Sequence, residues 1–173
     1  MESQPIDIPF SKHILGNRLE VIIHEDHACG LAAVNLWYHV GSKNEVAGRT
    51  GFAHLFEHLM FEPSKHFGTT YFELLQRAGG QINGSTSTDR TNYWELVPSN
   101  ALELALWMEA DRMTYMLPSL TATAFETQRD VVLNERRQNY ENRPYGLAMV
   151  ALSEALFPAD HPYNWITIGS PAD

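Results

Sequence analysis

The chain has little cysteine, little basic charge and no long apolar run, and each shortage excludes a class of protein. Its one cysteine, Cys29, cannot form a disulfide within the chain or build a thiolate zinc site, and we expect a small, partly buried apolar residue there. Twelve Lys and Arg against 21 Asp and Glu give a net charge of -9. Nucleic-acid binding requires a basic face, so this charge argues against nucleic acid as a partner. No apolar run approaches the length of a membrane span.

The composition is otherwise that of a folded domain. Hydrophobic residues make up 44% of the 173 residues, which is enough for one sizeable core. The first residues, Met1–Pro5, lack the basic and apolar regions of a signal peptide, although a mature domain would look the same. The compartment, cytoplasmic or periplasmic, therefore stays open.

The order of the predicted elements favours an α+β fold. Ile14–His24 predicts a strand pair turned at Gly16-Asn17, Leu31–Val40 a long strand, and Ile82–Val97 two polar strands. Helices are predicted at about 50–62, 70–78, 99–117, 121–142 and 147–157. Strands grouped among runs of helices indicate a mainly antiparallel sheet covered by helices. The chain stops at Asp173 without a terminating element, so we expect a domain that is incomplete at its C-terminus.

Two of these helices carry specific expectations about their ends and faces. Thr50 is the expected N-cap of the first helix. The apolar side of that helix should hold Phe52, Leu55, Phe56, Leu59 and Met60. The helix from about residue 99 is amphipathic, with Leu102, Leu106, Trp107, Met113 and Met116 among its apolar positions.

The opposite side of the first helix carries the strongest chemical signal in the chain. At about 100° per residue, His54, Glu57 and His58 share one stripe of roughly a 100° arc. Neutral imidazoles one turn apart can bind one metal ion, and Glu57 lies beside them as a proton acceptor. The alternative is a pair of histidines that make ordinary hydrogen bonds. A metal site is favoured, because uncompensated polar groups on an otherwise apolar helix are costly to bury.

His54-Leu55-Phe56-Glu57-His58 resembles the inverted zinc motif, His-x-x-Glu-His, of the pitrilysin/insulinase family of zinc metallopeptidases, which includes mitochondrial processing peptidases. Further matches follow in order at Gly41-Ser42, Gly51-Phe52-Ala53, Phe67-Gly68-Thr69, Ala78-Gly79-Gly80, Asn83, Thr88, Asp89, Thr91, Tyr93, Val131–Glu135 and His161-Pro162-Tyr163. The resemblance spans about Ile14 to Pro171. It implies a processing-peptidase-like metallohydrolase domain with zinc as its cofactor, here the N-terminal catalytic domain over residues 1–173.

The resemblance also implies the remaining ligand. The family supplies a third zinc ligand from a later helix, and that position falls on Glu135. Without the histidine motif, a solvated helix carboxylate would be the better interpretation of Glu135. Glu126 and Glu141 do not match the family position. The mechanism implied is metal-assisted peptide hydrolysis, with Glu57 as the general base.

One position departs from the family pattern. Family members often place a second glutamate two turns before the ligand glutamate, where this chain has Gln128. Glutamine keeps the size and the hydrogen bonding but loses the charge, which predicts reduced activity with an intact set of ligands.

The polar strand that begins near Ile82 has an implied role in substrate binding. In the resembling family the edge near Asn83 receives the substrate as an added strand, whereas a polar edge strand is ordinarily protection against aggregation. Gly84 stands where the family more often has alanine, which permits close backbone approach but predicts a looser edge.

The resemblance leaves two functions open. The first is a zinc endopeptidase that acts on peptides or unfolded segments, with a second homologous domain or subunit that helps to enclose the substrate. The second is a non-catalytic structural or partner subunit of the same family. Such subunits typically lose residues of the zinc motif, and this chain retains all four.

Overall fold

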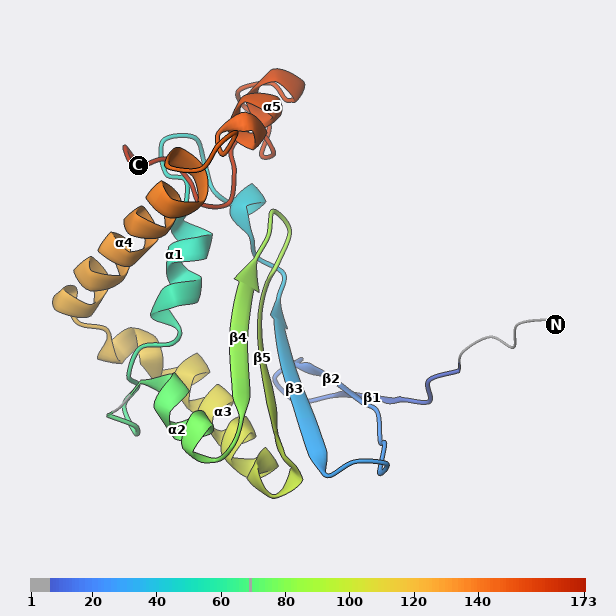
Figure 1. Ribbon diagram of the computed structural model, residues 1–173. Helices are drawn as coiled ribbons and strands as arrows, with labels where there is room; N and C mark the ends of the chain where they lie inside the picture. Colours follow the sequence, from blue (N-terminus) through green and yellow to red (C-terminus); the bar gives the residue numbers. More distant parts are fainter. Residues whose placement is uncertain (1–6, 69) are drawn as a thin grey trace. The chain divides into compact units, whose positions relative to one another are not determined.

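The computed structural model of the chain describes residues 7–68 and 70–173 (Figure 1). The start of the chain, residues 1–6, and Thr69 of the Phe67-Gly68-Thr69 match lie outside the described residues. The chain divides into two compact units, one up to Gly30 and one from Leu31 to Asp173.

The first unit is a β-hairpin. Strands β1 (Ser11–Ile14) and β2 (Glu20–Ile23) pair antiparallel, and the turn between them contains the predicted Gly16-Asn17. Arg18 has a positive φ of 71°, and the Asn17 side chain accepts a hydrogen bond from Leu19 N at 3.1 Å. Strand β1 begins at Ser11, whereas we had predicted that it begins at Ile14. Cys29 is exposed in a loop after β2, so the expectation that it is partly buried was wrong.

The second unit is built on an antiparallel sheet. Strands β3 (Leu31–Tyr38), β4 (Gln81–Thr86) and β5 (Thr91–Pro98) lie in the order β3-β5-β4. In the described residues β4 pairs only with β5, so it is an edge strand. The predicted α+β class with an antiparallel sheet is confirmed.

Helices cover one face of this sheet (Figure 1). They are α1 (Phe52–Leu59), α2 (Tyr71–Arg77) and α3 (Leu102–Ser119), while α4 (Ala122–Arg136) packs on α1 and α5 (Ala148–Leu156) lies beyond one end of the sheet (Figure 1). Helix α1 contacts β4, β5 and α4, while α2 and α3 contact the sheet and each other. Side chains from α2, α3 and β5 form the main core, among them Tyr71, Leu75, Val97, Ala105 and Met108. In the described part of the chain, none of the helices is long and apolar enough to cross a membrane.

Helix α3 buries a charged residue and leaves several of the predicted apolar residues exposed. Met116 is buried as predicted, with 2% exposed, whereas Leu106, Trp107 and Met113 are 51%, 44% and 44% exposed. Arg112 is fully buried instead, and it donates hydrogen bonds to Glu109 on its own helix and to Glu95 on β5. The hydropathy pattern could not anticipate this, because a guanidinium is tolerated in the core only when hydrogen-bond acceptors such as these satisfy it.

The start of α1 also differs from the prediction. Its N-cap is Gly51, with φ 89°, and the Thr50 side chain does not cap the helix. The carboxylate of Glu45 accepts hydrogen bonds from Gly51 N at 3.0 Å and Ala53 N at 2.7 Å. A carboxylate from a preceding loop therefore satisfies the first amides of the helix, while Thr50 donates its hydroxyl proton to Asp173.

The apolar side of α1 is only partly buried. Leu59 and Met60 are 3% and 4% exposed, whereas Phe52 and Phe56 are 49% and 44% exposed. These two phenylalanines line a cavity of about 660 Å³ together with residues of the loop after β3.

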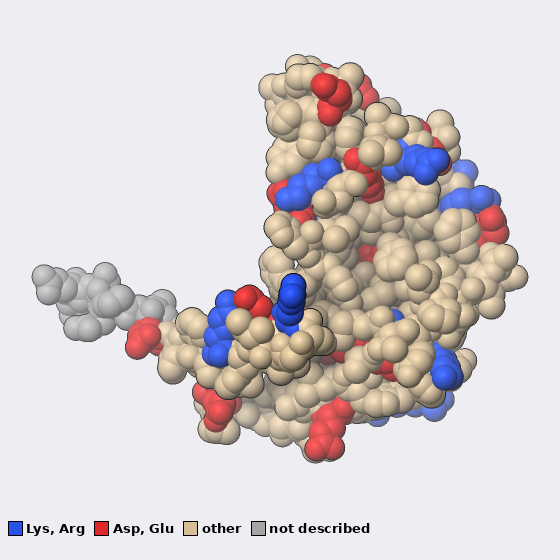
Figure 2. Space-filling view, turned by 180° about the vertical axis from the view of Figure 1, so that it is seen from behind, with Lys and Arg blue, Asp and Glu red and all other residues tan. Residues whose placement is uncertain are grey.

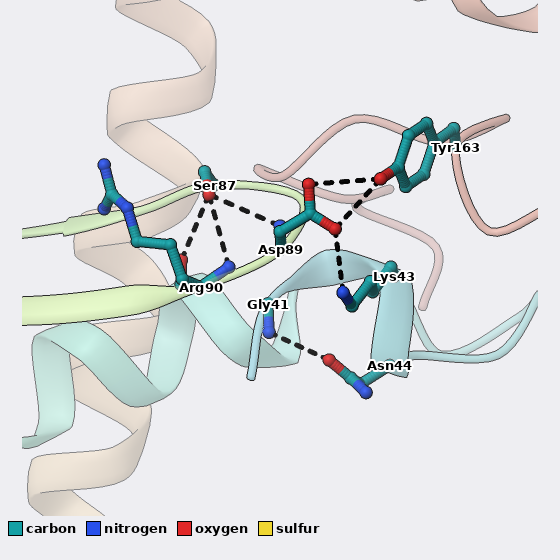
Figure 3. A network of polar contacts seen from close by, with 7 residues as sticks. All are labelled: Gly41, Lys43, Asn44, Ser87, Asp89, Arg90 and Tyr163. Carbon is teal, nitrogen blue, oxygen red and sulfur yellow. Dashed lines mark hydrogen bonds and ion pairs between the residues drawn. The ribbon is translucent and has the colours of Figure 1, made fainter. Parts of the chain in front are cut away.

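Polar contacts around Asp89 connect several of the matched motifs (Figure 3). Asp89, in the turn between β4 and β5, accepts hydrogen bonds from Lys43 Nζ at 2.8 Å and from the Tyr163 hydroxyl at 2.9 Å. Gly41 packs so closely on this turn that a Cβ there would lie 2.4 Å from Ser87 O. Gly41 therefore has no room for a Cβ, and Asp89 joins Lys43 and Tyr163 through hydrogen bonds.

Positive and negative side chains are interspersed on the surface shown in Figure 2. Figure 2 shows one face, on which Lys and Arg lie in small separate groups beside Asp and Glu. Exposed ion pairs such as Arg77–Glu73 and Arg129–Glu126 also place opposite charges next to each other.

Candidate metal centre

Helix α1 presents its titratable groups together. The rings of His54 and His58 meet edge to face, with their centroids 4.8 Å apart. Glu57 lies between them in sequence and is only 9% exposed. The stripe predicted from helical periodicity is present in the structure.

Helix α4 brings Glu135 to the same point. Its Oε2 atom lies 3.3 Å from His58 Nε2 and 3.7 Å from His54 Nε2. One ligand atom from each of the three residues lies within 4.8 Å of the others. Zinc ligands about 2.0–2.1 Å from a tetrahedral ion are separated by roughly 3.3 Å. The distances from Glu135 Oε2 to the two histidines are close to this value, and imidazole and carboxylate are donors that zinc accepts. Among the described residues, no other such group of three His, Cys, Asp or Glu is found.

The helix geometry changes directly after Glu135. Helix α4 gives way to a π-helical turn (Arg137–Glu141), where we had predicted a continuous helix to residue 142. Such turns are frequent at functional sites. Asn139, on this turn, donates a weak 3.5 Å hydrogen bond to Glu135 Oε1, so the turn contributes to the position of Glu135.

Burial sets the ionisation of the site. It is the main cause that lowers the pKa of His54, with the charge of Glu135 opposing it. Burial also raises the pKa of Glu57, against a hydrogen bond from Thr86. A neutral imidazole is the form that binds a metal, and a carboxylate with raised pKa is a stronger proton acceptor. His54 therefore suits metal binding, and Glu57 suits proton transfer.

A cavity of about 440 Å³ contains all the site residues predicted from the sequence. Its lining combines carboxylate, imidazole and amide groups with two aromatic rings: His54, Glu57, His58, Phe61, Glu62, Thr70, Phe72, Asn83, Gly84, Gln128 and Glu135. Asn83 and Gly84 come from β4, so the edge strand forms one wall of the cavity.

The register of β4 shows which backbone groups face the open edge. Ser87 N donates to Arg90 O across the turn, and the pairing alternates from there. Gly84, opposite Tyr93, is therefore at a non-hydrogen-bonded pair, and its N–H and C=O point away from β5. Asn83 Oδ1 accepts the hydrogen bond of Gly84 N at 2.9 Å. The edge beside the metal ligands thus offers backbone groups to another strand.

Two residues of the site were missed in the sequence. Thr86 Oγ1 donates to Glu57 Oε2 at 2.5 Å. Glu62 Oε1 accepts a hydrogen bond from Gln128 Nε2 at 2.6 Å. The period of two along β4 from Gly84 was a signal for Thr86, and the position one turn after His58 was a signal for Glu62.

The chain matches a family model over most of its length. Residues 20–163 match the model described as insulinase, peptidase family M16. A zinc protease of Helicobacter pylori, PqqE, is 34% identical over 157 residues, which cover 90% of this chain and 35% of that protein.

Two solved structures are similar in fold. A protease from Helicobacter pylori superposes with a TM-score of 0.87 at 33% identity, covering 94% of this chain and 39% of that one. Pitrilysin gives a TM-score of 0.79 at 26% identity, covering 98% of this chain and 18% of its own. The chain therefore spans about a third of the length of the zinc protease, and less of pitrilysin.

Proposed function

The chain belongs to the insulinase family of peptidases, peptidase family M16, and on this premise we propose that it is the catalytic part of a zinc-dependent endopeptidase. One observation carries the proposal: His54, His58 and Glu135 offer three ligand atoms within 4.8 Å of one another. Glu57 lies beside them in the same cavity.

We assign the zinc ligands to His54, His58 and Glu135. When bound there, zinc supplies a Lewis acid that polarises a peptide carbonyl and lowers the pKa of water. Glu57 acts as the general base: its carboxylate accepts a proton from the attacking water and passes it to the leaving amine. Its burial and its raised pKa suit this role.

Strand β4 is the proposed site for the substrate backbone. The edge-facing N–H and C=O of Gly84 can pair with an extended peptide, as in strand addition. Asn83, whose side chain now holds that N–H, is the second residue in this role. Such binding recognises the peptide backbone more than its side chains, which suits peptides or unfolded segments as substrates.

We further propose that residues 1–173 are the N-terminal catalytic domain of a longer protein. The relatives are two to three times longer or more, which supports this. A second homologous domain or subunit would position the substrate and exclude water, and positioning alone can supply several kcal/mol of a barrier. The isolated chain should fold and bind zinc, yet cleave peptides poorly until that part is added.

The test is cleavage of internally quenched peptides by the full protein that contains this chain. Activity should be lost with a chelator and return with zinc. Glu57→Gln should keep the zinc and lower kcat about 10²–10⁴-fold. Glu135→Gln should instead lose the zinc. Glu126→Gln, at an exposed glutamate of the same helix α4, is the matched control and should change neither.

The same experiment distinguishes the proposed endopeptidase from the alternative function, a non-catalytic partner subunit. A zinc-loaded full protein that cleaves no peptide, alone or with a homologous partner, would favour that alternative. Loss of zinc from Glu57→Gln with retention by Glu135→Gln would reverse the two assigned roles.

A further inference from the structure

We propose that Thr86 is a positioning residue that holds the carboxylate of Glu57, so that the strand which receives the substrate also places the general base. This inference rests on the proposed function and adds a residue to it. It is carried by the contacts between the inner face of β4 and helix α1.

The central contact is a short hydrogen bond. Thr86 Oγ1 donates to Glu57 Oε2 at 2.5 Å. Among the described residues it is the only hydrogen bond that the Glu57 side chain makes. Glu57 is only 9% exposed, so water has little access to take over this role. The Thr86 hydroxyl therefore fixes the orientation of the carboxylate.

A second threonine supports the first. Thr91, opposite Thr86 on β5, has its hydroxyl 3.3 Å from Thr86 Oγ1 and donates to Val40 O at 3.0 Å. Thr91 is 6% exposed. Thr91 has a single hydroxyl proton, so while that proton is given to Val40 O the Thr91 oxygen packs against the Thr86 hydroxyl from the side of the sheet, and the Thr86 proton is free for Glu57.

Gly84 confines the other oxygen of Glu57. It lies two residues before Thr86, on the same face of β4. A Cβ at Gly84 would lie 3.1 Å from Glu57 Oε1 and 3.2 Å from the Phe61 ring. One carboxylate oxygen is therefore bonded to Thr86, while the other packs on the bare backbone of Gly84.

The same strand presents its free edge. Gly84 and Thr86 alternate with the residues that bond to β5, so their backbone N–H and C=O point toward the open side. A peptide that pairs with this edge would contact the backbone of the residues that hold Glu57. Strand β4 would therefore both bind the substrate backbone and position the general base.

The test compares Thr86→Val with Thr86→Ser in the full protein. Valine keeps the branched shape but removes the donor, whereas serine keeps the donor. We expect Thr86→Val to lower kcat roughly 10- to 100-fold with KM and zinc content unchanged, because a misplaced base reduces the rate without affecting binding. Thr86→Ser should recover most of the activity.

The control for replacing threonine by valine is Thr114→Val. Thr114 is exposed on α3, and within the described part of the chain its hydroxyl bonds only to Ala110 O of its own helix. It should leave kcat unchanged. An unchanged kcat in Thr86→Val, or equal losses in Thr86→Val and Thr86→Ser, would overturn the proposed role of the hydroxyl.

A measurement without turnover separates this inference from the proposed function. In crystals of the zinc-loaded proteins, the Glu57 carboxylate should leave its position in Thr86→Val and keep it in Thr86→Ser. An unmoved carboxylate in Thr86→Val would contradict the inference even in an active enzyme. A wild-type protein that binds zinc but cleaves nothing would contradict the proposed function and leave the crystallographic result to decide the role of Thr86.

Discussion

Replacing Gln128 by glutamate should destabilise the protein, because Gln128 is matched to Glu62. The amide nitrogen of Gln128 donates to Glu62 Oε1 at 2.6 Å, and both side chains are half-buried in the cavity of the metal centre. In Gln128→Glu two carboxylates would occupy these positions. This chain thus carries its carboxylate at Glu62, beside the position where the family often has a second glutamate.

The magnitude follows from two effects. A hydrogen bond to a charged group contributes about 1.5–3 kcal/mol. Two like charges about 4 Å apart repel by about 1 kcal/mol in water and about 4 kcal/mol near a protein surface. Half-exposed groups can turn toward water, so we expect the low end, about 2 kcal/mol in total. For a domain of this size that corresponds to a fall in Tm of roughly 4–8 °C.

The assay is thermal unfolding at neutral pH with a chelator present, so that metal binding does not contribute. Gln76→Glu, at an exposed position of α2, is the control and should shift the free energy of unfolding by no more than about 0.5 kcal/mol. The double variant Glu62→Gln with Gln128→Glu exchanges donor and acceptor and should recover most of the lost stability. A single variant Gln128→Glu as stable as the wild type would refute the pairing of these two residues.

Three further predictions concern the framework of the site. Gly41→Ala should cost about 1–3 kcal/mol, because its Cβ would lie 2.4 Å from the backbone oxygen of Ser87, while Gly16→Ala, with nothing within 4 Å, should be neutral in the same denaturant titration. Glu45→Ala should cost about 1–2 kcal/mol and weaken zinc binding, since it removes the cap of α1; unchanged unfolding and zinc titrations would contradict this. Burial and the neighbouring Glu109 raise the pKa of Glu95 to about 9, so the folded state retains a proton there. The proton on Glu95 contributes to the free energy of unfolding, and this contribution is complete below the usual carboxyl pKa. It is lost as the pH rises through about 9, at up to about 1.4 kcal/mol per pH unit. Glu95→Gln should remove this slope, and an identical slope in the variant would show that another group causes it.

Helical periodicity was sufficient to bring together the first part of the site. His54, Glu57 and His58 are close in sequence, so a period of 3.6 alone predicts that they share a face. Glu135 lies on another helix, and only the family resemblance indicated it. The period of two along β4 places Thr86 on the same face as Gly84, but its contact with Glu57 depends on the packing of β4 against α1, which no local pattern contains.

Two of the errors share one physical cause, which is that polar groups are satisfied by partners outside the local pattern. Thr50 is a good N-cap by residue type, but the amides at the start of α1 bond to Glu45. Arg112 has the wrong hydropathy for a core position, yet side-chain oxygens of Glu109 on α3 and Glu95 on β5 accept its hydrogen bonds. Its guanidinium also lies 4.2 Å and 4.3 Å from the ring centres of Tyr71 and Tyr93. Local propensity does not include the hydrogen-bond partners that only the tertiary fold brings close.

The most direct test of the central proposal is a crystal structure of the zinc-loaded protein with data collected on both sides of the zinc absorption edge. We predict one anomalous peak within about 2.0–2.2 Å of His54 Nε2, His58 Nε2 and a carboxylate oxygen of Glu135, with Glu57 close by but not bound to the metal. A peak elsewhere, or no peak in protein shown by elemental analysis to carry zinc, would contradict the assignment of this cavity as the catalytic metal centre.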